Sequence, residues 1–431
     1  MMFEKYDAYK DSGIGLIGNI PENWFVKKLK FITQINSSSL PENHPKNDII
    51  SYVDIGNVSY EKGIGDVQQF KFSESPSRAR RIANCGDTVV STVRTYLKAI
   101  AYVNEKESEY IYSTGFAVLS PNEELNSKFL LNFVRSNSFT HQVDIVAKGM
   151  SYPAINSTEL ANLWVAFPDK PAQEKIVDFL DQKTSEIDQA IAIKEKQIAL
   201  LNERKQIVIQ KAVTQGLDPN VPMKDSGVEW IGEIPEHWEI KKLKYVLEER
   251  SERSRDGLEP LLMMSQIHGL VVRSEYSDKA EVAATTVGNK LVYHNDLVFN
   301  KLKAHLGVFF GSVHEFVGSV SPDYAVYKPI KYIENSKFLE LLFRNPLYIK
   351  QFILRSSGIV EGLIRLYTTE LFDLKIAIPP NQEQKDILNF VEQQSVKFDE
   401  VIENYIQQIE KLKEYKTTLI NDVVTGKIKV A

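Results

Sequence analysis

Basic and aromatic residues follow a short apolar stretch at two places in the chain, and their types suit contacts with nucleic acid. A cation beside a planar ring at the end of a strand can bond phosphates and base edges. The alternative is that these residues are solvated charges without a ligand. The first group is Arg94, Thr95, Tyr96 and Lys98, and the second is Lys301, Lys303 and His305. A further basic cluster, Arg78, Arg80 and Arg81, occurs only in the first half.

Several motifs that would indicate catalysis fail on context. The segment Gly13–Gly18 matches the G-x-G-x-x-G dinucleotide fingerprint, but no strand pattern precedes it and no helix pattern follows it. The chain has no G-x-x-x-x-G-K-[ST] phosphate loop and no H-x-x-x-H pair, and Pro379-Pro380 lacks the context of an adenine methyltransferase motif. The sequence therefore predicts no catalytic residue, no metal site and no cofactor in this chain.

Composition predicts a folded, cytoplasmic protein with more than one domain. Hydrophobic residues make up 43% and charged residues 25% of the 431 residues, close to the globular average. No apolar stretch is long enough to span a membrane. A single cysteine, Cys85, excludes an internal disulfide. The net charge of −5 means that any contact with nucleic acid must be local.

The sequence contains an internal duplication. The segment Asp11–Thr33 recurs 214 residues later as Asp225–Leu247, with the shared pattern DSG-x6-IP-x2-W. NSKFL recurs 209 residues after its first occurrence, and Gly149 and Gly358 keep the same offset. A period of this length indicates a duplicated domain with pseudo-two-fold symmetry rather than a solenoid. The order is domain, helix, domain, helix, with boundaries predicted at 1–163, 164–217, 218–373 and 374–431.

Each half ends in a long helix pattern, from about Gln173 to Thr214 and from about Gln384 to Thr425. Apolar residues at 4-3 spacing predict a coiled-coil seam along both helices, and we expect the two helices to pair antiparallel. The alternative is that each helix packs only on its own domain. Both seams are interrupted at matching points, Lys205 and Lys416 among them. The predicted seam residues are Leu180, Ile187, Ile191, Ile198, Leu201, Val208, Phe398, Ile402, Tyr405, Ile409, Leu412 and Leu419.

The two arms between these helices are predicted to be α+β. Their apolar stretches are short and are bounded by Gly, Asn, Asp and Pro, as strands are, and each NSKFL segment begins a helix pattern. The predicted strands are 49–55, 87–92, 99–103 and 115–119 in the first arm, and 261–264, 282–292, 297–299, 308–313 and 324–327 in the second.

Taken together, these features resemble the specificity subunits of Type I restriction-modification enzymes along nearly the whole chain. The resemblance rests on the DSG-x6-IP-x2-W opening, the GD- or ND-initiated strand of each arm, the Pro-x-Gln-Glu entry to each helix and the Thr and Gly at each exit, T-x-G in the first half and T-G in the second. It implies two target-recognition domains for a bipartite double-stranded DNA site, held apart by an antiparallel helical spacer. Arg94 and Lys303 become the leading candidates for DNA contact, together with Gly149, Ser151 and Tyr152 and the counterpart of that loop at Gly358.

The same resemblance implies a prokaryotic complex with two methyltransferase subunits and two ATP-dependent restriction subunits. S-adenosylmethionine, ATP and Mg would then be bound by those partners. Three alternatives remain at this point: the target-recognition subunit of a different methylase-nuclease system, an orphan helical scaffold or decoy without DNA specificity, and a free-standing methyltransferase, for which the motifs are missing.

Overall fold

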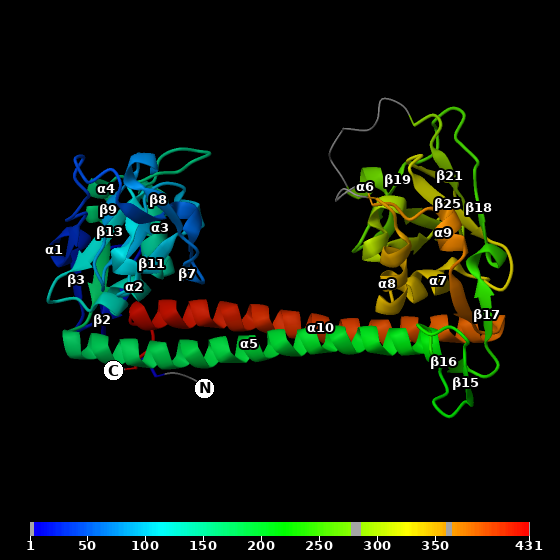
Figure 1. The fold of residues 1–431 in the computed structure, drawn as a ribbon. Coiled ribbons are helices and arrows are strands. Elements are labelled where there is room, and N and C mark those ends of the chain that lie inside the picture. The colour runs from blue at the N-terminus through cyan, green and yellow to red at the C-terminus, as the bar shows by residue number, and fades with distance from the viewer. Residues whose placement is uncertain (1–3, 277–285, 359–363, 431) are drawn as a thin grey trace. The chain divides into compact units, whose positions relative to one another are not determined.

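The computed structural model describes residues 4–276, 286–358 and 364–430. The chain forms two compact units: unit 1 comprises Met1–Glu195 and Ile406–Ala431, and unit 2 comprises Lys196–Tyr405. Each unit contains an α+β body and part of each of two long helices, α5 (Lys170–Gln215) and α10 (Asn381–Val424) (Figure 1). The predicted α+β class and both long helices are confirmed. Unit 1 is built from two separate stretches of chain.

The body of unit 1 is organised around a four-stranded antiparallel sheet in the order β11-β10-β13-β4. A second four-stranded sheet, β8-β5-β12-β9, forms a separate lobe, and β14 pairs with β3. Its strands are β1 (Tyr9–Asp11), β2 (Asn19–Pro21), β3 (Phe25–Lys28), β4 (Thr33–Ile35), β5 (Ile49–Val53), β6 (Val58–Ser59), β7 (Gly63–Ile64), β8 (Gln68–Lys71), β9 (Ala79–Ile82), β10 (Thr88–Ser91), β11 (Ile100–Tyr102), β12 (Ile111–Ser113), β13 (Phe116–Pro121) and β14 (Trp164–Phe167). Its helices are α1 (Leu29–Ile32), α2 (Ser127–Arg135), α3 (Asn137–Val146) and α4 (Ser157–Ala161), with the 3-10 helices η1 (Ile55–Asn57), η2 (Phe72–Glu74), η3 (Thr95–Leu97) and η4 (Glu107–Glu109).

The body of unit 2 repeats the first sheet as β23-β22-β25-β18, and β17 pairs with β26 as β3 does with β14. Its lobe differs, with two-stranded sheets β19-β20 and β21-β24. The strands are β15 (Met223–Asp225), β16 (Glu233–Pro235), β17 (Glu239–Lys242), β18 (Leu247–Glu249), β19 (Leu262–Ser265), β20 (Gly269–Val272), β21 (Lys290–Val292), β22 (Leu297–Asn300), β23 (Phe309–Gly311), β24 (Gly318–Val320), β25 (Tyr324–Pro329) and β26 (Lys375–Ile378). The helices are α6 (Arg273–Tyr276), α7 (Ser336–Phe343), α8 (Pro346–Arg355), α9 (Thr368–Phe372), η5 (Leu243–Tyr245) and η6 (Lys301–Leu306).

Local sequence explains the repeated sheet and helix. The central strand β10 is buried along its whole length, as expected for a Val-rich strand covered on both faces. Helix α2 begins at the NSKFL motif because the side chain of Asn126 accepts hydrogen bonds from the backbone N–H groups of Lys128 and Phe129. Asn335 caps α7 in the same way by accepting from Lys337. The motif is therefore a helix N-cap in both units.

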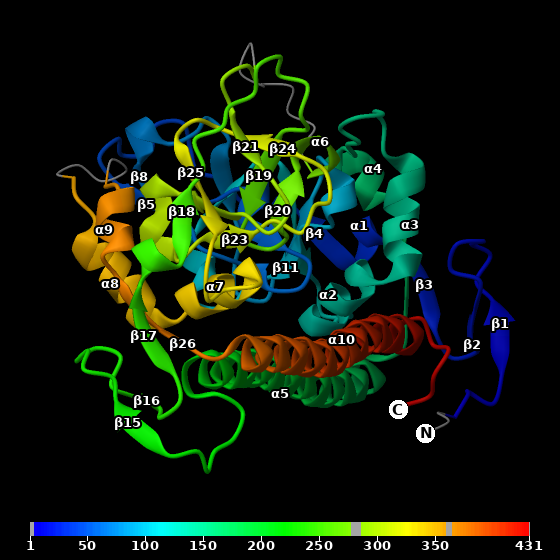
Figure 2. The same cartoon turned by 90° about the vertical axis from the view of Figure 1, so that its right-hand side faces the viewer.

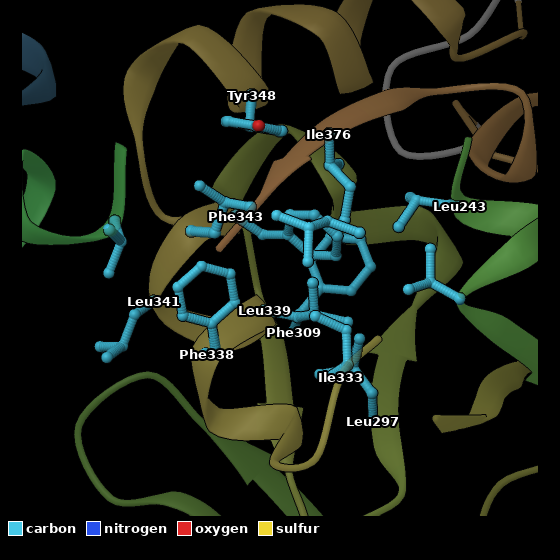
Figure 3. Packing of buried hydrophobic residues seen from close by; sticks show 14 of the residues in the cluster. Leu243, Leu297, Phe309, Ile333, Phe338, Leu339, Leu341, Phe343, Tyr348 and Ile376 are labelled. Carbon is cyan, nitrogen blue, oxygen red and sulfur yellow. The ribbon is translucent and has the colours of Figure 1, made fainter. Parts of the chain in front are cut away.

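The core of unit 2 joins the sheet, α7, α8 and β26 (Figure 3). The rings of Phe299 and Phe309 stack with centroids 4.1 Å apart, and Phe343 meets Phe309 edge-on at 4.8 Å. The same cluster includes Ile209 and Val391 from the long helices. Unit 1 has a matching core to which both helices also contribute. Each body is thus packed onto the helices as well as connected to them.

The predicted seam positions face inward in both units. All ten 4-3 positions of α5 between Leu180 and Ala212, and all ten of α10 between Val391 and Val423, are buried or half-buried. Most intervening positions are exposed. Figures 1 and 2 show α5 and α10 side by side within each unit. This burial pattern is that of a packed helix pair.

The lysines that interrupt the seam form equivalent ion pairs. In unit 1, Lys416 lies 2.7 Å from Asp188, and in unit 2, Lys205 lies 2.7 Å from Asp399. The two pairs correspond under the internal repeat, with a 211-residue offset for both partners. A polar pair at a seam position helps to select one helix register.

The repeated IP-x2-W motif holds the glycine that ends a long helix. Trp24 and Trp238 are both buried. Gly426 follows α10 with a φ of 75°, and a Cβ at this residue would lie 2.4 Å from Cδ of Pro21 and 3.5 Å from the ring of Trp24. Gly216 follows α5 with a φ of 78° and lies against Trp238 in the same way. The motif is structural, and only glycine fits the joint at residue 426.

Some predicted boundaries need correction. The strand predicted for 282–292 is restricted to Lys290–Val292 among its described residues, because Gly288 forms a turn with a φ of 85°. Residues 282–285 of that prediction lie outside the described part of the chain. The strand predicted to reach residue 55 ends at Val53, and η1 begins at Ile55. The Gly13–Gly18 segment lies in the turn between β1 and β2, a hairpin rather than a strand-to-helix junction.

Candidate nucleic-acid interface

In unit 1 the predicted basic residues lie on a turn at the end of β10, which we call the Arg94 turn (residues 92–98). Arg94 and Lys98 have left-handed backbone conformations, with φ of 52° and 45°. Between them, η3 buries Thr95 and leaves Tyr96 55% exposed. The conformation of the turn places Arg94 and Tyr96 in solvent while the backbone stays anchored in the sheet.

A second segment, the Gly149 loop (residues 147–156), is pinned to this turn. The backbone N–H of Ile155 donates to the carbonyl of Thr92 at 2.8 Å, and that of Thr95 donates to Pro153 at 3.3 Å. The loop is closed on itself by two hydrogen bonds of 2.9 Å between Lys148 and Ala154. Two groups of residues that are about 50 positions apart in the sequence are therefore brought together.

The tip of the Gly149 loop and the Arg94 turn present one exposed surface. The guanidinium of Arg94 lies 5.2 Å from the centroid of the Tyr152 ring. Tyr152 is 65% exposed, and Ser151 and Met150 are also exposed. Gly149 has a φ of 108°, and a Cβ there would lie 3.0 Å from the carbonyl oxygen of Tyr152, so the tight loop requires glycine. A cation on an exposed ring can contact a phosphate or a base.

An ion pair lies at the base of the Gly149 loop. Lys148 Nζ lies 2.9 Å from Glu159 Oε1, at the start of α4. The pKa of Glu159 lies below its ordinary value, first because the backbone N–H of Asn156 donates to the carboxylate and second because of Lys148. Asn156 in turn caps α4. The loop is thus fixed at both ends while its tip stays exposed.

The second basic cluster belongs to the lobe of unit 1. Arg81 and Arg80 lie on β9 and are half-buried, and Arg80 stacks 4.8 Å from the ring of Phe72. Arg78 is exposed, and its carbonyl accepts the N–H of Thr114 at 2.8 Å. The next residue, Gly115, accepts a hydrogen bond from Thr92. Thr114 and Gly115 therefore link the backbone of Arg78 to the Arg94 turn. Arg80 and Arg81, in contrast, lie on β9 within the lobe.

Unit 2 repeats the arrangement of turn and loop. Leu366 N–H donates to the carbonyl of Lys301 at 3.1 Å, the counterpart of the bond between Ile155 and Thr92. Ser357 and Arg365 form a pair of backbone hydrogen bonds at 2.9 and 2.8 Å, as Lys148 and Ala154 do. Gly358 begins the loop tip with a φ of 147°, and residues 359–363 lie outside the described part.

The predicted side chains of this second turn differ in exposure. Lys303 is exposed, whereas Lys301 is half-buried with its Nζ 3.7 Å from Glu249. His305 lies in η6, and its side chain is outside the described part of the structure. Lys303 is therefore the clearest counterpart of Arg94.

Two basic residues beside these loops were not selected from the sequence. Lys148 precedes Gly149 directly, and Arg365 follows the Gly358 loop with its guanidinium 3.9 Å from Asp323. The sequence did contain a signal for Lys148, because this cation directly precedes the loop glycine Gly149. Arg365 had no comparable signal, because only its backbone pairing with Ser357 places it at the loop.

Within residues 4–276, 286–358 and 364–430, no group of three or more His, Cys, Asp or Glu side chains is arranged to hold a metal ion. Among the helices of the same ranges, none has the length and apolar content needed to cross a bilayer.

Comparisons with known proteins agree with this architecture. Residues 21–203 match the family described as Type I restriction modification DNA specificity domain. The putative type I restriction enzyme MjaX specificity subunit of Methanocaldococcus jannaschii is 25% identical, over all of this chain and 99% of that protein. The MjaIX specificity subunit of the same organism is 24% identical, over 96% and 95% of the two chains.

Two solved structures share the fold. The HsdS subunit from Thermoanaerobacter tengcongensis aligns over 95% of this chain and 98% of its own, with a TM-score of 0.53 and 19% identity. A chain from a structure concerned with the assembly and conformational transition of the type I restriction-modification system aligns over 94% and 98%, with a TM-score of 0.67 and 19% identity. With its duplicated bodies and its paired helices, the chain is similar over nearly its whole length to specificity subunits of Type I restriction-modification enzymes.

Proposed function

We propose that this chain recognises a two-part DNA sequence, one part by each unit, on behalf of a Type I restriction-modification complex. One observation carries the proposal: both units pin a loop onto a cationic turn by equivalent hydrogen bonds, Ile155 to Thr92 and Leu366 to Lys301. The framework is the same, but the side chains that it presents differ, as Arg94 and Lys303 do. Two such surfaces suit two different half-sites.

The exposed residues suit a mixture of phosphate and base contacts. An arginine can bond a guanine edge with two hydrogen bonds, whereas a lysine acts as a point charge. The net charge of −5 limits the phosphate neutralisation that this chain can supply by itself. We therefore expect weak DNA binding by the chain alone and tight, specific binding by the assembled complex.

Methylation and cleavage are assigned to partner subunits. The sequence lacks a phosphate loop and an adenine methyltransferase motif, so S-adenosylmethionine, ATP and Mg would be bound by the partners. A methyltransferase must turn its target base out of the duplex, and the specificity subunit would hold the flanking DNA in place for that step.

The long helices are proposed to set the distance between half-sites. Helix α5 has 46 residues, which corresponds to about 69 Å at about 1.5 Å per residue. Both helices carry seam residues along most of their length and contribute to the cores of both bodies. A stiff pair of helices fixes a spacing in a way that a loop would not.

A binding experiment on the complex with its methyltransferase tests the proposal. Methylation mapping in the host genome supplies the duplex, and fluorescence anisotropy then compares that duplex with versions in which one or both half-sites are scrambled. We expect each scrambled half-site to weaken binding, and the chain alone to discriminate poorly. If the assembled complex binds all duplexes equally, DNA recognition is not the function of this chain.

A further inference from the structure

The segment that follows each IP-x2-W motif has the same pattern of exposure in both units. Its sequence is FVKKLKFI at 25–32 and EIKKLKYV at 239–246. In both copies the leucine and the last residue are buried, while the lysine and the aromatic residue between them are exposed. Phe31 is 63% exposed and Tyr245 is 55% exposed. We call this pair of surfaces the Lys-aromatic corners: Lys27, Lys30 and Phe31 in unit 1, and Lys241, Lys244 and Tyr245 in unit 2.

Each corner holds a lysine above its exposed ring. Lys30 Nζ lies 5.3 Å from the centroid of Phe31, and Lys244 Nζ lies 5.1 Å from that of Tyr245. Lys30 also donates to the side-chain oxygen of Asn162 at 2.9 Å, a neutral partner. Among the described residues, neither Lys30 nor Lys244 forms a salt bridge. These charges are therefore available to a carboxylate on another molecule.

In unit 2 the corner is one wall of a groove of about 420 Å³. Its lining contains three lysines, two tyrosines and one isoleucine and no acidic residue: Lys241, Lys244, Tyr245, Ile330, Lys331 and Tyr332. Tyr332 has a left-handed backbone with a φ of 66°, and its carbonyl accepts the side-chain N–H of the buried Gln384 at 2.6 Å. The ring of Tyr332 lies 4.9 Å from Lys241. The wall of the groove opposite the corner is thus held by Gln384, in the first turn of α10.

The internal duplication gives a comparison within one chain. The buried members of the repeated motif have a structural reason to stay the same, since they fill the cores around Trp24 and Trp238. The exposed Lys30 and Phe31 have no such reason. The residues that face the proposed half-sites differ between the units, so a surface that is kept in both must contact something that is identical at both.

Two classes of molecule are identical at both units: the DNA backbone and a partner protein present in two copies. The exposed ring of Phe31 has no donor for a phosphate oxygen. Exposed aromatic residues beside cations are instead typical of binding hot spots between proteins. Lys27 and Lys241 are ion-paired within the chain, with Glu124 and Glu239. The other two lysines of the corners, Lys30 and Lys244, favour a partner with acidic groups around an apolar centre.

We propose that each Lys-aromatic corner docks one copy of the methyltransferase subunit, through an acidic, apolar-centred surface of that subunit. The proposal rests on the function proposed above, which supplies two copies of this partner. It locates the docking site on the bodies, beside β3 and β17, in addition to any contact on the long helices.

Native mass spectrometry of the full chain mixed with its methyltransferase subunit, without DNA, tests the assignment. The variants are Lys30→Glu with Phe31→Ser, Lys244→Glu with Tyr245→Ser, and all four together. We expect two bound subunits for the wild type, one for each single-corner variant and none for the fourfold variant at the same concentration, with a dissociation constant at least about tenfold higher per altered corner. The control is Lys106→Glu with Leu258→Ser, two exposed residues outside the corners.

The other outcomes contradict the proposal in different ways. Variants that bind two methyltransferase subunits normally, but bind every duplex more weakly and with a shallower salt dependence, would show that the corners contact DNA phosphates. A wild-type chain that binds no methyltransferase would contradict the proposed function itself. Circular dichroism of each variant verifies that the bodies remain folded.

Discussion

Arg94 and Lys98 combine a backbone conformation that is unfavourable for side-chain-bearing residues with a position at the candidate interface. A left-handed residue other than glycine costs on the order of 1–2 kcal/mol, and such residues cluster where a ligand is held. Here the conformation turns the chain sharply after β10 and places Arg94 over Tyr152. The strain is offset by the hydrogen bonds that pin the Gly149 loop to the turn.

At this scale we predict that Arg94→Ala affects one half-site only. The assembled complex should lose about 1–3 kcal/mol of discrimination at a base in the half-site of unit 1, because a bidentate contact is lost, and keep its preference at the other half-site. Lys303→Ala should affect the other half-site instead. Anisotropy titrations against duplexes varied one half at a time measure both effects, with Lys106→Ala as control. Equal weakening at both halves by Arg94→Ala would contradict the assignment.

The secondary-structure elements show which features short-range patterns predict. Every position that the 4-3 spacing selected on α5 and α10 is buried or half-buried, because a helix repeats its environment every three to four residues. The spacing did not select other buried residues, such as Ile209 and Val213, which pack on the body of unit 2. Among the described residues of the strand predicted at 282–292, only Lys290–Val292 form a strand. The turn at Gly288 ends the extended conformation that the β-propensity of Val287 favours.

The candidate site was predicted only in part for a related reason. Arg94 and Tyr152 were both selected from the sequence, but their proximity depends on long-range hydrogen bonds that no local pattern reveals. The burial of Thr95 and the location of Arg80 within the lobe also follow from tertiary packing.

A second prediction concerns the joint at the end of α10. Gly426→Ala should lower the free energy of unfolding by more than Gly18→Ala does. Both residues have a positive φ, 75° and 72°, so both alanines carry about 1–2 kcal/mol of backbone strain. Only at Gly426 would the added Cβ collide with Pro21, whereas no atom lies within 4 Å of a Cβ at Gly18.

Urea denaturation of both variants measures this difference. Equal losses of stability would mean that Pro21 moves aside freely and that the IP-x2-W motif does not clamp the helix end.

At the scale of the whole molecule, both long helices belong to both units. Unit 1 takes the first part of α5 and the last part of α10, and unit 2 takes the remainder. A change in helix length therefore leaves each body with its own helix contacts and alters only the part between them. Under the proposed function, the distance between half-sites could therefore change without a change in the bases that each unit reads.

A third prediction follows for the spacer. Deletion of one heptad from each helix, residues 198–204 and 400–406, should shorten the gap between half-sites by about three base pairs, since seven residues span about 10.5 Å and a base pair about 3.4 Å. The pairs Asp188–Lys416 and Lys205–Asp399 are retained. Methylation mapping gives the new motif. If the bases of a half-site change instead, the helices do not act as the spacer.

The two-part construction of unit 1 also fixes the order in which the protein is completed during synthesis. The core around Trp24 and Phe129 needs Leu419 and Val423, which the ribosome adds only after the whole of unit 2. At about 5–20 residues per second, the 210 residues of unit 2 take about 10–40 s to be made. Most of unit 1 therefore emerges first, but its core is completed last.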